Sequence, residues 1–307
     1  MKAFCTGVIS RILVGLLIML SAVPLHLLLW LSKGVAFLVG QVFQYRRAVV
    51  TANLQRSFPD KSPAEIATIR RQFYLHLSDL FFETISLFGA PRKAIKKRFD
   101  PDQQGLALLE SFYAEGRSVI CLMGHQGNWE QLPACLNFFS RGLLAIYKPL
   151  RNKAFDNFLA SIRSRFAAGI VTDRQVARAL RNLQKENKHI AIGLVSDQSP
   201  GNQDLVWLDF MNQDTAVYKG PERLARMFDL PVVFLYTQKI KRGRYQVKVD
   251  LIAAHPKTLD DGEITRRYMD MLEREIRRNP PHYLWSHRRW KKKRGREGER
   301  ESIGRRA

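Results

Sequence analysis

Two residues that can move a proton stand five positions apart in the segment 124–130, which reads GHQGNWE. The imidazole of His125 can take a proton from a hydroxyl group, and the carboxylate of Glu130 can hold the ring in the required tautomer and stabilise the imidazolium. The oxygen activated in this way can attack an acyl thioester directly, while backbone N–H groups stabilise the resulting oxyanion. The motif therefore predicts acyl transfer, with His125 and Glu130 as the catalytic residues.

The spacing of His125 and Glu130 requires a bend in the chain between them. Residues five apart in one continuous helix are rotated by about 140° and face apart. The apolar run 118–123 (SVICLM) predicts a buried strand before the motif, and the segment 129–139 predicts a helix after it. We therefore expect His125 at the carboxyl end of a strand and Glu130 in the first turn of the next helix.

The residues between the histidine and the glutamate suit a tight turn. Gly124 and Gly127 allow a sharp bend and a close approach of substrate to the backbone, and Asn128 is a typical helix N-cap. A histidine and a glutamate at this spacing recur by chance in many proteins, so the prediction depends on the Gly-rich turn after an apolar strand. The other histidines of the chain lack such a turn.

Strands and helices alternate on both sides of the motif. Apolar runs predict further strands at 143–147, 189–195, 230–237 and 245–253, and amphipathic patterns predict helices at 62–82, 153–166, 174–185 and 219–228. The helix at 62–82 begins with a capping box from Ser62 to Glu65 and has Pro63 at its first position. This alternation predicts an α/β domain with a mainly parallel central sheet flanked by helices. Ligands on such sheets sit where strands end and helices begin.

The N-terminal segment 12–31 carries no formally charged side chain and is long enough to cross a bilayer as one helix. Arg11 and Lys33 bracket it, and Pro24 within it allows a kink or an interfacial position. A cleaved signal peptide and a buried core helix are the competing interpretations. The basic residues that follow the segment predict that the bulk of the chain lies on the cytoplasmic side of a membrane.

These patterns divide the chain into a membrane-anchor region (1–47), a catalytic domain (48–290) and a basic tail (291–307). The formal net charge of +22 favours an anionic partner, which can be nucleic acid, anionic lipid or an acidic carrier protein. No zinc-finger or RNA-recognition pattern supports nucleic acid. Three cysteines without CxxC spacing predict neither a disulfide framework nor a metal site, and they fit a reducing cytoplasm.

Several further motifs follow GHQGNWE along the chain: YKPLRN at 147–152, RFAAG at 165–169, SDQ at 196–198, YKGP at 218–221 and YLWSHRRWK at 283–291. Together these motifs resemble the bacterial lipid A late acyltransferases, the lauroyl/myristoyl transferase family. That family lies within the wider glycerolipid acyltransferase superfamily, which shares a His-x4-Asp/Glu dyad. Glutamate at position 130 favours the lipid A branch, and the resemblance covers most of the chain.

The resemblance implies a glycerolipid-acyltransferase-like fold with an N-terminal membrane helix. It implies a reaction without cofactor or metal at the cell inner membrane, with the catalytic domain on the cytoplasmic face. The donor would be a thioester of acyl carrier protein, the acceptor a hydroxyl of a lipid A precursor, and no nucleic acid would take part. The implied substrate-binding residues are Gly127, Asn128, Tyr147, Lys148, Arg151, Asn152, Arg165, Asp197 and Gln198.

Some of these residues have two possible roles each. Lys148, Arg151 and Arg165 would hold phosphate or a sugar carboxylate, or would be surface charges and structural ion pairs. Asp197 and Gln198 would bind substrate or brace the loop of His125, and bracing is the favoured role. Lys148 stands where the family usually has arginine, which puts bidentate phosphate binding there in doubt.

Alternatives remain within and outside this enzyme class. A glycerophospholipid or mannoside-type acyltransferase would act on a related acceptor, and the second would use acyl-CoA. A membrane-tethered basic binding module would account for the charge without any chemistry. A non-catalytic scaffold on the same fold is the third alternative, and the intact pair of His125 and Glu130 argues against it.

Overall fold

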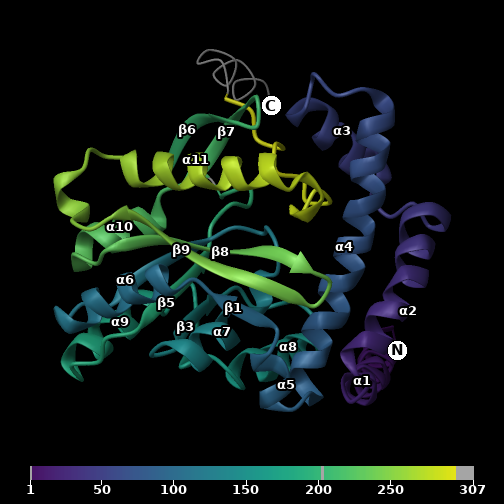
Figure 1. Ribbon diagram of the computed structural model, residues 1–307, viewed down its shortest axis with the longest axis horizontal. Helices are drawn as coiled ribbons and strands as arrows, with labels where there is room; N and C mark the ends of the chain where they lie inside the picture. Colours follow the sequence, from purple (N-terminus) through teal and green to yellow (C-terminus); the bar gives the residue numbers. More distant parts are fainter. Residues whose placement is uncertain (1, 202–203, 295–307) are drawn as a thin grey trace, which may run out of the picture.

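The computed structural model describes residues 2–201 and 204–294, and a seven-stranded sheet forms the centre of this part (Figure 1). The strand order is β1-β9-β8-β2-β5-β3-β4, and all neighbouring pairs are parallel except β8 and β9. The predicted α/β fold with a mainly parallel sheet is therefore confirmed. The strands are β1 (Phe99–Pro101), β2 (Val119–Met123), β3 (Leu143–Tyr147), β4 (Gly169–Thr172), β5 (Ala191–Val195), β8 (Val232–Lys241) and β9 (Arg244–Ala253).

Helices cover both faces of the sheet, and a separate antiparallel hairpin of β6 (Leu205–Phe210) and β7 (Gln213–Tyr218) stands apart from it. Figure 1 shows α11 crossing one side of the sheet, with α5 to α8 grouped on the other side. The α-helices are α1 (Lys2–Ser21), α2 (Leu25–Phe37), α3 (Arg47–Ser57), α4 (Pro63–Gly89), α5 (Arg92–Lys96), α6 (Gln103–Ala114), α7 (Leu132–Phe139), α8 (Lys153–Ser164), α9 (Val176–Lys185), α10 (Gly220–Phe228) and α11 (Glu263–Arg278). Short turns of other helix types are η1 (Leu38–Val42), η2 (Trp129–Gln131), η3 (Pro256–Thr258) and η4 (Pro280–His282).

The central strand β2 is buried on both faces, as an interior parallel strand must be. Ile120 and Leu122 point into a core shared with α4 and α11, whereas Val119 and Cys121 point into a second core with α6, α7 and α8. Successive side chains of a strand face opposite ways, so the all-apolar β2 contributes side chains to both cores. Strand β2 is therefore a rigid support for the residues that follow it.

Helix α4 is longer than the sequence pattern predicted. Its predicted start is confirmed, because Ser62 accepts from the backbone of Glu65 and the Glu65 side chain accepts from the backbone of Ser62 in return. The helix then continues to Gly89 and runs between the sheet and the N-terminal helices (Figure 1). It therefore contacts both the predicted membrane region and the domain core.

The apolar N-terminal stretch forms two helices rather than the single helix predicted for 12–31. Helix α1 ends at Ser21, and α2 begins after Pro24, which takes an extended ψ of 137° and has no N–H to continue a helix. Within the described residues, the segment long and apolar enough to cross a membrane is Leu25–Val42. The expected basic tail lies outside the described residues from position 295 onward.

Candidate active site

His125 and Asp197 follow two neighbouring parallel strands at the same distance from their ends. Met123 of β2 is paired in register with Val195 of β5, and each of the two polar residues comes two positions later. Because the carboxyl ends of parallel strands meet at one edge of the sheet, the two side chains are brought together. The prediction that His125 stands just beyond a buried strand is confirmed.

The Asp197 carboxylate holds His125 at two points. Its Oδ1 lies 2.6 Å from the ring Nδ1 of His125, and its Oδ2 accepts the backbone N–H of His125 at 3.1 Å. Asp197 is only 1% exposed. Burial alone would raise its pKa, but the charge and hydrogen bonds of His125, together with the charge of Arg289, hold the pKa below its usual value. Asp197 is therefore an anion beside the imidazole.

This contact determines which ring nitrogen of His125 carries the lone pair. A carboxylate at Nδ1 favours the tautomer that carries its proton there, so Nε2 has the lone pair. The side-chain nitrogen of Gln198 lies 3.0 Å from Nε2, and the Trp129 ring meets the imidazole edge-on with ring centroids 4.9 Å apart. The expected bracing role of Asp197 and Gln198 matches these contacts.

Glu130 contacts a different partner from the one expected. Arg163 of α8 donates from Nη2 to Oε1 at 2.7 Å and from Nε to Oε2 at 3.1 Å, which forms a two-point ion pair. The ring nitrogens of His125 contact Asp197 and Gln198 in the part of the chain that the structure describes. The expectation that Glu130 orients the imidazole is thus corrected: the end of β5 supplies that carboxylate, and Arg163 takes both oxygens of Glu130.

His125 and Glu130 nevertheless line one cavity of about 390 Å³, within the range of about 300–1,000 Å³ typical of ligand pockets. Its wall combines polar side chains with apolar ones, and the apolar part suits a fatty acyl chain. The polar lining residues are His125, Glu130, Tyr147, Lys148, Arg163 and Gln198. The apolar lining residues include Met123, Trp129, Pro133, Leu143, Ala145, Ile146, Pro149, Leu150 and Val195.

Three of the residues expected to bind substrate line this cavity, namely Tyr147, Lys148 and Gln198. Two others have structural roles. Arg165 donates to backbone carbonyl oxygens in the segment 87–90, where α4 ends, and so satisfies orphan acceptors there. Its guanidinium is therefore a helix C-terminal cap, which is the structural one of its two expected roles, and phosphate binding by Arg165 stays a prediction.

Asn152 also belongs to the scaffold. Its side-chain oxygen caps α8 by accepting the backbone N–H of Ala154 at 3.0 Å, and its amide donates to Ser10 of α1 at 2.8 Å. These contacts give Asn152 a structural role, and its expected binding of substrate stays a prediction. Arg151, next to it, is exposed and is absent from the lining of the described cavity.

Gly127 and Asn128 are buried beneath the cavity rather than lining it. Gly127 has a φ of +61°, and a Cβ there would lie 2.1 Å from Oγ1 of Thr237, so packing explains the glycine. The Asn128 side chain does not cap the helix after it. It donates to Oε2 of Glu83 at 2.5 Å, deep under the motif. Burial raises the pKa of that carboxyl.

The C-terminal motif at 283–291 wraps the GHQGNWE loop from the other side. The backbone N–H of Leu284 donates to the carbonyl of His125 at 3.0 Å, and Gly127 donates to the carbonyl of His282 at 2.9 Å. His287 accepts the backbone N–H of Ser199 through Nε2, and burial lowers its pKa to about 4. The segment 282–291 therefore holds the GHQGNWE loop in place. Among the described residues, no group of three metal-binding side chains is present.

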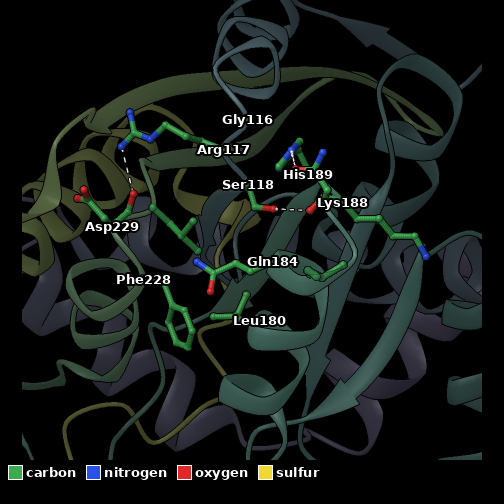
Figure 2. A pocket seen from close by; sticks show the side chains of 12 residues that line it. Gly116, Arg117, Ser118, Leu180, Gln184, Lys188, His189, Phe228 and Asp229 are labelled. Atoms are coloured by element: carbon green, nitrogen blue, oxygen red, sulfur yellow. Dashed lines mark hydrogen bonds between the residues drawn. The ribbon is translucent and has the colours of Figure 1, made fainter.

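A second hollow of about 250 Å³ lies at the opposite edge of the sheet, where β2, β5 and β8 begin. Figure 2 shows its polar side chains bonded to neighbouring backbone: Arg117 to the carbonyl of Asp229, and Ser118 to that of Lys188. None of the expected catalytic or binding residues lines it. The cavity beside His125 is therefore the candidate active site.

A buried aspartate beside a partly exposed histidine, at the ends of parallel strands and next to a cavity, is an arrangement typical of α/β enzymes. The chain belongs to the bacterial lipid A biosynthesis acyltransferases, since the model of that family matches residues 6–292. It is 22% identical over 277 residues to the lipid A biosynthesis acyltransferase of Haemophilus influenzae, covering 88% of this chain and 83% of that one. It is 21% identical over 280 residues to the lipid A biosynthesis palmitoleoyltransferase of Escherichia coli K12, and the match covers 90% of this chain and 89% of that one. The recognised family and the assignment as an acyltransferase are confirmed.

Proposed function

We propose that the enzyme moves a fatty acyl chain from a thioester of acyl carrier protein to a hydroxyl of a lipid A precursor. His125 acts as the general base. Nε2 takes the hydroxyl proton, the oxygen attacks the thioester carbonyl carbon, and the carbon–sulfur bond breaks as the thiolate leaves. The imidazolium then returns its proton to the thiolate. Asp197 stabilises the imidazolium while it carries the extra proton.

Glu130 acts through Arg163 in this proposal. The two hydrogen bonds from Arg163 use Nε and Nη2, while Nη1 makes no hydrogen bond among the described residues. Glu130 thus fixes a guanidinium at the cavity wall with one edge open to an anionic oxygen of the substrate. Lys148, exposed at the same cavity, supplies a second positive charge for phosphate.

The observation that supports this function is the 2.6 Å contact of Asp197 with Nδ1 of His125, because it leaves the lone pair on Nε2, at a cavity whose wall is partly apolar. The family supports lipid A chemistry for the acceptor. The net charge of +22 suits two anionic substrates, a phosphorylated lipid and an acidic carrier protein. We further propose that the protein works on the cytoplasmic face of the inner membrane, with residues 1–47 as its membrane-binding region.

The test uses membranes that contain the protein or its His125→Ala variant, an acyl carrier protein thioester and a lipid A precursor. Loss of the base should reduce product formation at least about a hundredfold while the protein remains folded. A variant that keeps its turnover would show that His125 is not the base. Replacing the carrier-protein thioester with the same acyl chain on CoA separates the proposed donor from the acyl-CoA alternative.

A further inference from the structure

Helix α2 runs alongside α4, and α1 packs against α4 near the end of that helix (Figure 1). A Cβ on Gly89 would lie 2.5 Å from Oγ of Ser21, so the end of α1 packs tightly against the end of α4. A Cβ on Gly40 would lie 2.7 Å from the ring of Tyr74, so the π-helical end of α2 packs just as closely. The junction between the two helices and the far end of α2 therefore both touch α4.

The middle of α2 is fixed to α4 by charged groups. Ser32 donates to Oδ1 of Asp79 at 2.6 Å, and Arg242 donates both to Asp79 and to the carbonyl of Leu29. Lys239 adds an ion pair to Asp79 at 2.9 Å, and the Asp79 side chain has no exposed surface. If α2 crossed a bilayer, this cluster would lie near the centre of the hydrocarbon or would have to separate from the helix. Either outcome is costly.

The outward face of the same two helices is apolar and edged by positive charge. The exposed large hydrophobic side chains there are Ile12, Leu13, Leu16 and Met19 on α1, and Leu27, Trp30, Leu31 and Phe37 on α2. Arg11, Lys33 and Arg46 are also exposed, and no acidic residue precedes Asp60 in the sequence. An apolar face with basic residues and no carboxylates is complementary to an anionic lipid surface.

The helix lengths agree with a position in the membrane plane. The apolar part of α1, Ile9–Ser21, would extend only about 20 Å as a helix, against about 30 Å of hydrocarbon. Part of Leu25–Val42 is buried against the domain, so that segment presents one face to its surroundings rather than its whole circumference. A helix that crosses a membrane as a free span would be surrounded by lipid.

We propose that α1 and α2 form an in-plane membrane hairpin, with the outer face in the lipid interface and the inner face on α4. The N-terminus, the turn at 22–24 and the catalytic domain all lie on one side of the membrane. The bond from Asn152 to Ser10 ties α1 to the loop that carries Lys148 and Leu150, so the cavity rim lies at the lipid surface. This inference deepens the proposed function, which supplies the membrane-resident substrate.

The topology test labels single cysteines with a membrane-impermeant maleimide in right-side-out and inside-out membrane vesicles. Ala22→Cys, at the exposed turn, is compared with Ala48→Cys on α3, both in a Cys5→Ser background. We expect both cysteines to react only in inside-out vesicles. Reaction of Ala22→Cys in right-side-out vesicles, or its protection in both, would overturn the in-plane hairpin, since the turn would then lie across or within the bilayer.

A second measurement uses the fluorescence of Trp30, whose side chain is 74% exposed. The difference in emission between the protein and its Trp30→Phe variant is recorded in vesicles of phosphatidylethanolamine and phosphatidylglycerol with brominated chains. Bromines near the headgroup should quench this signal more than bromines near the chain end. Stronger quenching by bromines near the chain end would overturn the proposal. An absence of quenching, as expected if a second copy of the chain covers this face, would also overturn it. Neither test requires turnover. The proposal on membrane position can therefore fail while acyl transfer proceeds.

Discussion

Replacing Asp197 with asparagine tests which carboxylate serves the catalytic histidine. The amide is nearly the same size as the carboxylate, but it can present an N–H to Nδ1 of His125 where the carboxylate accepts at 2.6 Å. The ring would then carry its proton on Nε2 and could not act as a base. The variant also removes the charge that stabilises the imidazolium in the transition state.

The expected loss is about 10³–10⁴-fold in kcat, or about 4–5 kcal/mol of transition-state stabilisation. Glu130→Gln is the matched comparison, because it removes one negative charge from the same cavity. Glutamine still accepts from Arg163, so only the charge-assisted part of that contact is lost, and about a tenfold decrease is expected. If Glu130 were the partner of the imidazole, Glu130→Gln would lose more kcat than Asp197→Asn.

The assay measures initial rates with a carrier-protein thioester and a lipid A precursor in detergent, alongside thermal unfolding of each variant. A double variant, His125→Ala with Asp197→Asn, should be no slower than His125→Ala alone, because the two residues act as one unit. A folded Asp197→Asn enzyme that keeps more than about a tenth of its kcat would refute the assignment of Asp197.

Three further predictions concern the scaffold. Gly127→Ala should destabilise the fold by about 2–4 kcal/mol, measured by denaturant unfolding, because a Cβ at φ +61° meets Oγ1 of Thr237. Arg165→Met should lower the unfolding temperature and leave the KM for the lipid acceptor within about twofold; a KM that rises tenfold with unchanged stability would restore its phosphate-binding role. Burial lowers the pKa of His282 and His287 to about 4 from about 6.5 in the unfolded chain, so the unfolded state binds more protons between these values. Their stabilisation is complete above about pH 6.5 and is lost as pH falls toward 4, by about 1–2 kcal/mol per histidine at about pH 5, which calorimetry in a pH series would detect or exclude.

Local signals in the sequence predicted the strand–turn–helix frame of the site. The apolar run before the motif became β2, and His125 lies directly past its end. The partner of His125 could not be predicted in this way, because it depends on which strands are neighbours. Once β2 and β5 are known to pair from Val119 with Ala191 to Met123 with Val195, Asp197 must lie next to His125. That pairing joins residues 72 positions apart and has no local pattern.

The role of Glu130 shows a different limit of sequence reasoning. Its spacing from His125 predicted that the turn would let the carboxylate hold the imidazole, whereas the structure brings both residues to one cavity and pairs Glu130 with Arg163. Spacing could not show where the carboxylate points, because Arg163 comes from α8, 33 residues later. Arg165, two positions beyond, was the residue singled out, yet it faces the end of α4. Two arginines only two positions apart thus have different partners, and composition alone could not tell them apart.

Helix α4 links the proposed membrane hairpin to the GHQGNWE loop through its polar residues. His76, Asp79 and Glu83 are spaced by three and four positions, so they share one buried face of the helix. His76 bonds to the carbonyl of Gly127 through Nε2, and burial lowers its pKa well below the usual value, so the neutral ring must donate there. Glu83 accepts from Asn128, while Asp79 accepts from Ser32 of α2. A displacement of the hairpin would thus be transmitted along one rigid helix to the loop that carries His125. For this reason, membrane docking and the geometry of the catalytic histidine are expected to be coupled.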